Sequence, residues 1–169
     1  MFKCTHSLDA KASTCGTACL WVLTGCLNTG EVSGVPVIKA LLEKLDGISD
    51  TIIDCPPGSA CVVMESIKKA DYCILVAEPT LFGVHNFQMV YELVKQFKKP
   101  FGAVLNKCID GENPAENFCI ENSIPILSKF PYNDELAKIN SSGLIAAREN
   151  VEFAEQFRQL LSAVKEAVS

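Results

Sequence analysis

The sequence predicts an α/β fold: a mostly parallel sheet between two layers of helices. Strand-like and helix-like segments alternate from Ser33 onward, several strand-like segments are continuously apolar, and polar residues stand where those segments end. Strands that alternate with helices form parallel sheets through right-handed crossovers, and apolar strands of this kind are covered on both faces. A chain of 169 residues with 49% hydrophobic content is long enough for one such core.

The first half of the alternation contains two helices and two strands. Residues 33–45 place Val37, Leu41 and further aliphatic side chains on one helical face, and the β-branched run at residues 51–55 predicts a buried strand. Pro56-Pro57-Gly58 ends that strand. A second helix is predicted over residues 60–69, and an apolar strand over residues 72–77 ends at Glu78-Pro79-Thr80.

The second half continues the pattern. Apolar residues at helical spacing predict a helix from Phe87 to Phe97, and residues 101–105 form the next strand, with Asn106-Lys107 as its polar exit. Residues 114–122 read as a helix and residues 124–130 as a strand, with Pro125 at its beginning. An apolar stripe from Phe153 to Val168 predicts a last helix that packs against the sheet.

The amino-terminal part of the chain has a different character. Residues 1–30 are rich in Cys, Thr, Ser and Ala without a clean period, so we expect an irregular cysteine-rich leader, followed by the α/β domain at residues 31–169. The nine cysteines are an odd number, which argues against a disulfide framework. The spacing of Cys4, Cys15, Cys19 and Cys26 fits neither zinc nor ferredoxin motifs, so free thiols are favoured. Cys61 is expected to be a small buried residue, and the alternative is a redox or cluster contact beside a helix N-terminus.

Charge and hydropathy exclude several classes of partner. The net charge of -5 and the pI near 5.1 provide no basic surface for nucleic acid. No apolar stretch approaches the ~20 residues that span a bilayer, and the first residues lack a signal-peptide core. The polar face of the last helix carries more acidic than basic side chains, which argues against binding of this helix to anionic lipid. A cytoplasmic protein with no nucleic-acid or membrane partner is expected.

Asp54 is the strongest candidate for a functional residue. An aspartate at the carboxyl end of a buried strand is well placed to hold Mg²⁺ through water, and Gly58 can bring its backbone N–H close to a phosphate. Ligands of parallel α/β sheets bind at this end of the strands. The alternative is structural: Asp54 caps the next helix, and Pro56-Pro57-Gly58 is a stiff turn.

The string Asp54-Cys55-Pro56-Pro57-Gly58-Ser59-Ala60-Cys61 resembles the switch II motif of the MinD/ParA/Mrp family of P-loop ATPases. This resemblance covers residues 28–168 and implies a P-loop NTPase-like fold that binds ATP and Mg²⁺. It implies that Asp54 coordinates the water shell of Mg²⁺, that Gly58 senses the γ-phosphate, and that Pro57 belongs to the same nucleotide-binding loop.

Two later motifs resemble the adenine-binding segments of the same family. Val104-Leu105-Asn106-Lys107 resembles the strand whose asparagine contacts adenine, and Phe130-Pro131-Tyr132-Asn133 resembles the loop that closes over the base. Guanine-binding proteins use Asn-Lys-x-Asp, and here Asp110 is one position too far, so adenine is preferred. The structural alternatives are a plain turn at Asn106-Lys107 and a helix entry with Asn133 as N-cap.

The resemblance is closest to a branch in which a ferredoxin-like domain with two 4Fe-4S clusters is inserted into the ATPase. It implies an iron-sulfur or redox partner, a 4Fe-4S cluster in the missing or partner region, and a homodimer as a further association.

The phosphate-binding loop of this family, the Walker A motif, is not found in the sequence. None of the early glycines, Gly16, Gly25, Gly30, Gly34 and Gly47, is followed by Lys-Ser or Lys-Thr. Backbone N–H groups and lysines of that loop neutralise most of the phosphate charge. We therefore expect a domain truncated at its amino terminus that does not hydrolyse ATP efficiently by itself. The alternative function is an inactive remnant, or an interaction and dimerisation module that keeps the fold. A missing central strand would leave sheet edges liable to self-association.

Overall fold

The computed structural model describes residues 8–15, 18–30, 33–45, 50–56, 58 and 61–168; up to residue 22 it describes the backbone only. The chain divides into two compact units, Met1–Lys69 and Ala70–Ser169. The expected division into a leader at residues 1–30 and a domain at residues 31–169 remains a prediction.

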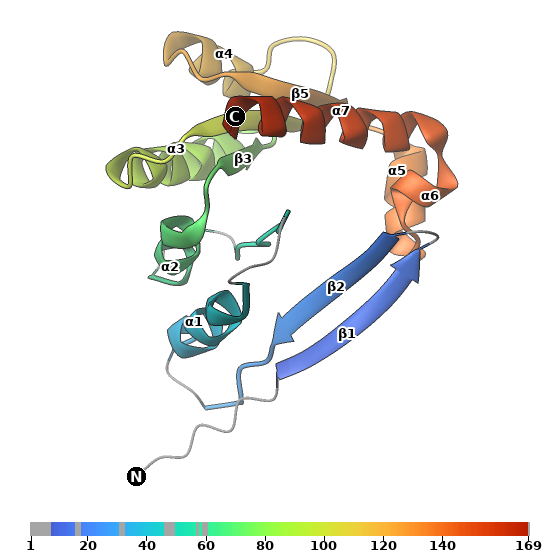
Figure 1. The fold of residues 1–169 in the computed structure, drawn as a ribbon. Coiled ribbons are helices and arrows are strands. Elements are labelled where there is room, and N and C mark those ends of the chain that lie inside the picture. The colour runs from blue at the N-terminus through green and yellow to red at the C-terminus, as the bar shows by residue number, and fades with distance from the viewer. Residues whose placement is uncertain are drawn as a thin grey trace. The chain divides into compact units, whose positions relative to one another are not determined.

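The first unit contains a β-hairpin and two helices. Strands β1 (Leu8–Cys15) and β2 (Ala18–Gly25) pair antiparallel, with Leu8 opposite Gly25 and Cys15 opposite Ala18 (blue arrows in Figure 1). The expectation of an irregular segment is therefore wrong for these residues. Residues 8–13 of β1 alternate apolar and polar side chains, a signal of a strand that the sequence analysis missed, whereas β2 is mainly apolar and carries no such alternation.

Two helices complete this unit. Helix α1 (Val35–Leu42) continues into the short 3-10 helix η1 (Glu43–Leu45), and α2 covers Cys61–Lys69. These helices confirm the predictions for residues 33–45 and 60–69. Residues 51–56 belong to no helix or strand, so the predicted strand at residues 51–55 is wrong. A β-branched run forms a strand only where a neighbouring strand offers a hydrogen-bonding ladder, and Ile52 is 90% exposed.

The second unit is an α/β layer structure around a three-stranded parallel sheet. The strands are β3 (Cys73–Ala77), β4 (Phe101–Cys108) and β5 (Ile126–Pro131), in the order β3-β4-β5 with both pairs parallel. The α/β class and the parallel sheet are therefore confirmed. In β4, the four residues from Gly102 to Leu105 are all buried, as expected for a strand with neighbours on both edges and helices over both faces.

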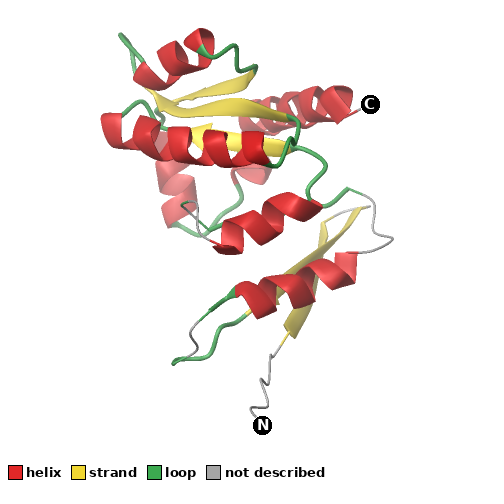
Figure 2. Cartoon of the chain, turned by 90° about the vertical axis from the view of Figure 1, so that its left-hand side faces the viewer, coloured by secondary structure: helices red, strands yellow, loops and turns green. Residues whose placement is uncertain are grey.

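Helices lie on both sides of this sheet, and Figure 2 shows α3 in front of it and α7 behind. Helices α3 (Leu81–Gln96) and α4 (Pro114–Glu121) pack through edge-on aromatic contacts, with ring centroids 5.8 Å apart for Phe87 and Phe118 and 5.6 Å apart for Tyr91 and Phe118. Helix α7 (Val151–Val168) lies against β5, where the rings of Phe130 and Phe157 are 5.2 Å apart.

Helices α5 (Asp134–Ser141) and α6 (Ala146–Glu149) join β5 to α7. Ile139, Ala146 and Phe153 form a small buried cluster with Leu136 packed against it. Of the stripe predicted on the last helix, Phe153 is buried, whereas Phe157, Leu161 and Val168 are 42%, 47% and 50% exposed. Packing against the sheet therefore accounts for only part of that stripe.

Candidate functional site

Asp54 lies in a segment of the first unit that belongs to no helix or strand. Both Asp54 and Cys55 are exposed. Helix α2 begins at Cys61, seven residues later, so the alternative in which Asp54 caps that helix is wrong. Gly58 has a φ of +98°, in the left-handed region that favours glycine, and a Cβ added there would meet no described atom within 4 Å. The backbone at Gly58 is open to an approaching group. Pro57 lies outside the described residues.

Asn106 and Lys107 lie in a β-bulge at the carboxyl end of β4. The register changes between Leu105, which faces Lys129, and Cys108, which faces Pro131, so β4 has one more residue than β5 over this stretch. Lys107 takes a left-handed φ of 55°, and its backbone N–H donates to the Asn106 Oδ1 at 3.0 Å. Bulges of this kind turn side chains away from the regular pleat and are frequent beside functional sites.

An ion pair joins this bulge to the neighbouring strand. The Nζ of Lys107 lies 2.7 Å from an Oε1 of Glu78, the first residue after β3. The hydrogen bond that the Lys107 ammonium donates to the Glu78 carboxylate, followed by the negative charge of that carboxylate, raises the pKa of Lys107. Both side chains are about half exposed, at 55% and 44%, so the pair adds little to stability. The ion pair instead fixes the position of the Lys107 side chain, because it connects the carboxyl ends of β3 and β4.

Tyr132 lies on the other side of the bulge. Its backbone N–H donates to the carbonyl of Cys108 at 2.8 Å, and its side chain is 57% exposed. Pro131, the last residue of β5, is exposed beside it. A hollow of about 400 Å³ opens at this place, and its lining consists of Cys108, Ile109, Asp110, Pro131 and Tyr132.

Asn133 serves as the N-cap of α5. Its Oδ1 accepts the backbone N–H of Leu136 at 3.0 Å, so the helix-entry alternative is confirmed. A contact between Asn133 and a base remains a prediction.

Two substitutions at Lys107, one to alanine and one to glycine, test the left-handed backbone conformation of this residue. Lys107→Ala and Lys107→Gly both remove the ion pair with Glu78, but only glycine relieves the left-handed φ of 55°. We expect the glycine variant to be more stable than the alanine variant by about 1 kcal/mol, the cost of a side chain in this region. Urea denaturation of the two variants measures the difference. Equal stabilities would show that Lys107 is not held in this conformation.

The candidate residues fall into two groups. Asn106, Lys107, Pro131 and Tyr132 meet in the second unit at the carboxyl ends of β4 and β5, with Asn133 next in sequence. Asp54 and Gly58 belong to the first unit. Sequence reasoning missed Glu78 as the partner of Lys107, and it missed the lining residues Cys108 and Ile109. Glu78 had a detectable signal, since it is an acidic residue directly after a buried strand.

Among the described residues, six cysteines are free. Cys61 is exposed at the start of α2, so the expectation that it is buried is wrong. Cys119 is fully buried, and burial raises the pKa of its thiol to about 11. Within the described ranges, no three His, Cys, Asp or Glu side chains gather into a metal site formed by protein ligands alone.

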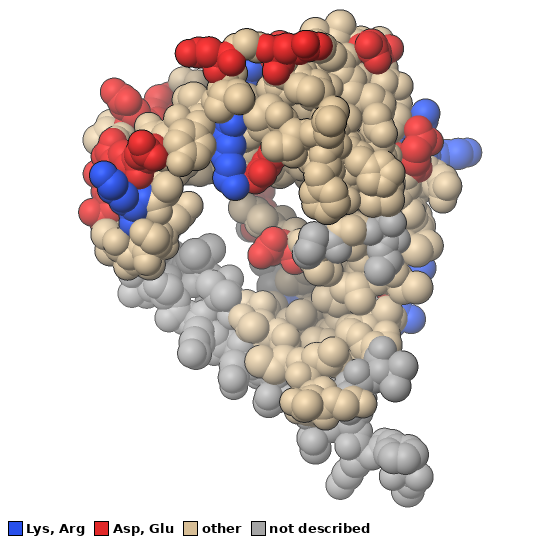
Figure 3. Space-filling model, turned by 180° about the vertical axis from the view of Figure 1, so that it is seen from behind, with Lys and Arg blue, Asp and Glu red and all other residues tan. Residues whose placement is uncertain are grey.

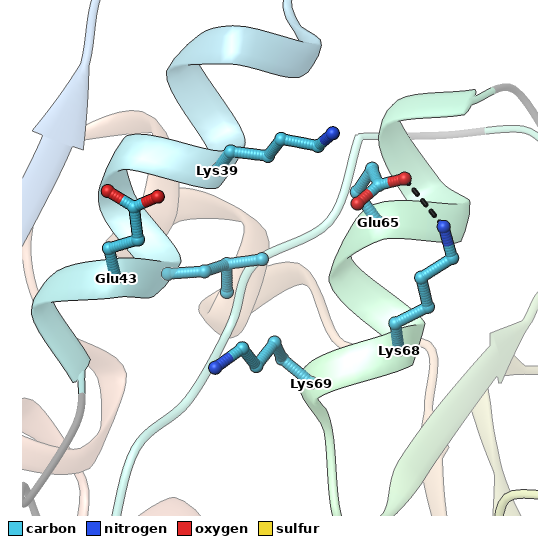
Figure 4. A pocket seen from close by; sticks show the side chains of 6 residues that line it. Lys39, Glu43, Glu65, Lys68 and Lys69 are labelled. Atoms are coloured by element: carbon cyan, nitrogen blue, oxygen red, sulfur yellow. Dashed lines mark hydrogen bonds and ion pairs between the residues drawn. The ribbon is translucent and has the colours of Figure 1, made fainter.

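A second hollow, of about 260 Å³, lies in the first unit between α1, η1 and α2. Figure 4 shows Lys39 and Glu43 on one side and Glu65, Lys68 and Lys69 on the other, with the Lys68 ammonium 2.7 Å from Glu65. Because acidic and basic groups alternate around it, this hollow does not select one sign of ligand charge. On the face in Figure 3, Asp and Glu gather along the upper edge, and Lys and Arg stand beside acidic groups at the left and right sides. In the described part of the chain, no helix is long and apolar enough to cross a membrane.

Comparison with known proteins supports the class of fold. No protein-family model matches the sequence. Two uncharacterised proteins of Methanocaldococcus jannaschii are similar: MJ0578, 25% identical over 117 residues, and MJ0579, 29% identical over 91 residues. These matches cover 69% and 52% of this chain, but only 40% and 33% of the relatives. The chain therefore spans less than half the length of the curated relatives it matches.

Two solved structures with a similar fold are MinD proteins. The cell division ATPase MinD of Pyrococcus furiosus superposes with a TM-score of 0.64 and 21% identity, over 76% of this chain and 57% of that one. The septum site-determining protein MinD of Pyrococcus horikoshii OT3, solved with Mg-ADP, gives a TM-score of 0.63 and 24% identity, over 75% and 55%. The chain thus has the α/β fold of MinD-type P-loop ATPases.

Proposed function

We propose that this chain is the adenine-binding and magnesium-binding part of a MinD-like ATPase domain, in which Asn106 and the segment from Pro131 to Asn133 frame the base. The observation that carries the proposal is the bulge at Asn106–Lys107, which lies beside Tyr132 and the hollow at the carboxyl ends of two parallel strands. Ligands of open parallel sheets bind at this end. The MinD of P. horikoshii, similar in fold, was solved with Mg-ADP.

The residues at this place suit an adenine ring through a hydrogen-bond donor, through apolar surface and through the fixed position of the Lys107 ammonium. The Oδ1 of Asn106 is engaged by the Lys107 N–H, which leaves its amide NH₂ to donate to a ring nitrogen. The exposed ring of Tyr132 and the side chain of Ile109 offer apolar surface at the hollow. The Lys107–Glu78 pair holds the ammonium of Lys107 toward β3.

Magnesium and phosphate involve the other group of residues. The exposed carboxylate of Asp54 is suited to Mg²⁺ through water, the mode of binding typical of an ion that keeps part of its hydration shell. The open backbone at Gly58 suits an approaching phosphate oxygen. Bound Mg²⁺ would neutralise phosphate charge. Hydrolysis is proposed to require a phosphate-binding loop that this sequence does not contain, and an iron-sulfur or redox protein is a further proposed partner.

Nucleotide selectivity tests the proposed adenine site. Asn106→Asp keeps the acceptor for the Lys107 N–H but replaces the NH₂ donor by an oxygen. We expect wild-type chain to bind ADP more tightly than GDP, and the variant to lose about tenfold or more in ADP affinity, since one hydrogen bond to the base is worth about 1.4 kcal/mol. Competition against a fluorescent ADP analogue measures both affinities.

Asn140→Asp is the matched control, because Asn140 is an exposed residue of α5 and the substitution makes the same change of charge. The ADP affinity of this control should equal that of the wild type. Equal loss in both variants, or equal affinity of the wild type for ADP and GDP, would overturn the adenine site. The inactive interaction module would then be the better account.

A further inference from the structure

The ammonium of Lys107 interacts with residues at the carboxyl ends of both outer strands. Its Nζ is 2.7 Å from the Oε1 of Glu78, which directly follows β3. The hydrogen bond to Glu78 and the charge of Glu78 are the main causes that raise the pKa of Lys107, desolvation opposes them, and the phenol group of Tyr132, directly after β5, adds to the rise. The strongest partner of this ammonium is therefore at the end of β3, and a residue that lines the hollow is within its electrostatic reach.

The backbone fixes Glu78 beside the bulge. Glu78 and Asn106 each follow the last residues that pair β3 with β4. The carbonyl of Glu78 accepts the backbone N–H of Thr80 at 2.8 Å. A Cβ added at Gly83 would lie 2.6 Å from the same carbonyl oxygen, so the turn from β3 into α3 is closely packed. The backbone that carries the Glu78 carboxylate therefore has a well-defined position.

An ammonium beside the base affects which base the hollow accepts. The ammonium of a lysine has donors and no acceptor. Guanine presents two acceptors, O6 and N7, on one edge, whereas adenine presents the acceptor N7 beside the donor N6–H₂. A free ammonium at this edge therefore favours guanine. Because the stem of a lysine side chain is long and flexible, a carboxylate is needed to hold its ammonium elsewhere.

We infer that Glu78 is a positioning residue that makes the hollow select adenine over guanine, because it holds the ammonium of Lys107 at the end of β3 and away from the base. This inference rests on the proposed adenine site at Asn106. Removal of Glu78 releases the ammonium toward the base, where it donates to O6 of guanine. Glu78 acts through Lys107 and needs no contact of its own with the nucleotide. Both side chains of the pair are about half exposed, so loss of the pair costs the fold little.

The test compares the Kd of Mg-GDP with the Kd of Mg-ADP by competition against a fluorescent ADP analogue. The wild type is expected to prefer ADP. In Glu78→Ala the ratio of the two Kd values should shift toward GDP by about tenfold, which corresponds to about 1.4 kcal/mol. Lys107→Met in the Glu78→Ala background should restore the wild-type ratio, because the released ammonium is then absent. The ratio removes the general effect of a changed net charge, since both nucleotides carry the same phosphates.

Two further variants complete the set. Glu78→Gln keeps an oxygen acceptor for the ammonium but not the charge, so it should shift the ratio in the same direction and by less than Glu78→Ala. Glu121→Ala is the matched control, because Glu121 is an exposed residue at the end of α4, and it should keep the wild-type ratio. Far-UV circular dichroism confirms that each variant is folded.

The possible results separate this inference from the proposed function. A Glu78→Ala ratio equal to that of the wild type would overturn the inference and leave the adenine site standing. So would a shifted ratio that Lys107→Met does not restore, because Glu78 would then act without Lys107. A wild type that binds ADP and GDP equally would overturn the adenine site itself, and this inference with it.

Discussion

Leu105→Ala is expected to lower the free energy of unfolding of the second unit by about 2–5 kcal/mol, the range for removing a buried leucine. Leu105 is fully buried in β4, the central strand of the sheet, between Ala77 of β3 and Lys129 of β5. A central strand cannot move to fill the cavity without disturbing both neighbours. Urea denaturation followed by circular dichroism measures the change.

Leu81→Ala is the matched control. Leu81 is 83% exposed at the start of α3, and the substitution removes the same atoms. Its effect should stay within about 0.5 kcal/mol, as for other surface positions. Equal effects of the two substitutions would mean that β4 is not the centre of the core.

Gly102→Ala is expected to destabilise the same unit by about 1–3 kcal/mol, because the site has no room for a methyl group. A Cβ at Gly102 would lie 2.7 Å from both the Cγ of Leu127 and the Oη of Tyr72. Leu127 belongs to β5 and Tyr72 directly precedes β3, so the missing side chain allows close packing across the sheet. Thermal or urea unfolding measures the loss.

A second substitution separates this clash from a general loss of packing. Tyr72→Phe removes the hydroxyl oxygen that the new methyl group would meet. The cost of Gly102→Ala should therefore be smaller in the Tyr72→Phe background than in the wild type, which a double-mutant cycle detects. Simple additivity would contradict the close approach of these groups.

The second unit was largely predictable because its signals are local. The apolar run that became β4 is buried on both faces, whereas the run that became β3 is buried on one face only, with Ile74 and Val76 exposed on the other. The helical spacing of Phe87 to Phe97 marks α3. Two features of the first unit were not predicted, although residues 8–13 of β1 alternate apolar and polar side chains. The hairpin β1–β2 depends on pairing between segments, and the β-branched run at residues 51–55 has the composition of a strand without forming one.

The candidate site was predictable in part. Polar residues after strands pointed to Asn106 and Lys107, but the family resemblance was needed to give them a role. The bulge, the left-handed Lys107 and the partner Glu78 could not be derived from composition, since they depend on the register between β4 and β5 and on the position of β3. The capping role of Asn133 was one of two alternatives that the sequence left open, and the fold shows it directly.

The central claim is that this chain binds a magnesium-nucleotide complex through Asp54. Calorimetric titration of the wild type with Mg-ADP, repeated with Asp54→Ala, tests it most directly, and Asp71→Ala is the control at another exposed aspartate. The account predicts a Kd tighter than about 1 mM that weakens about tenfold or more in Asp54→Ala and is unchanged in Asp71→Ala. Binding weaker than about 1 mM, and the same in Asp54→Ala, would contradict it.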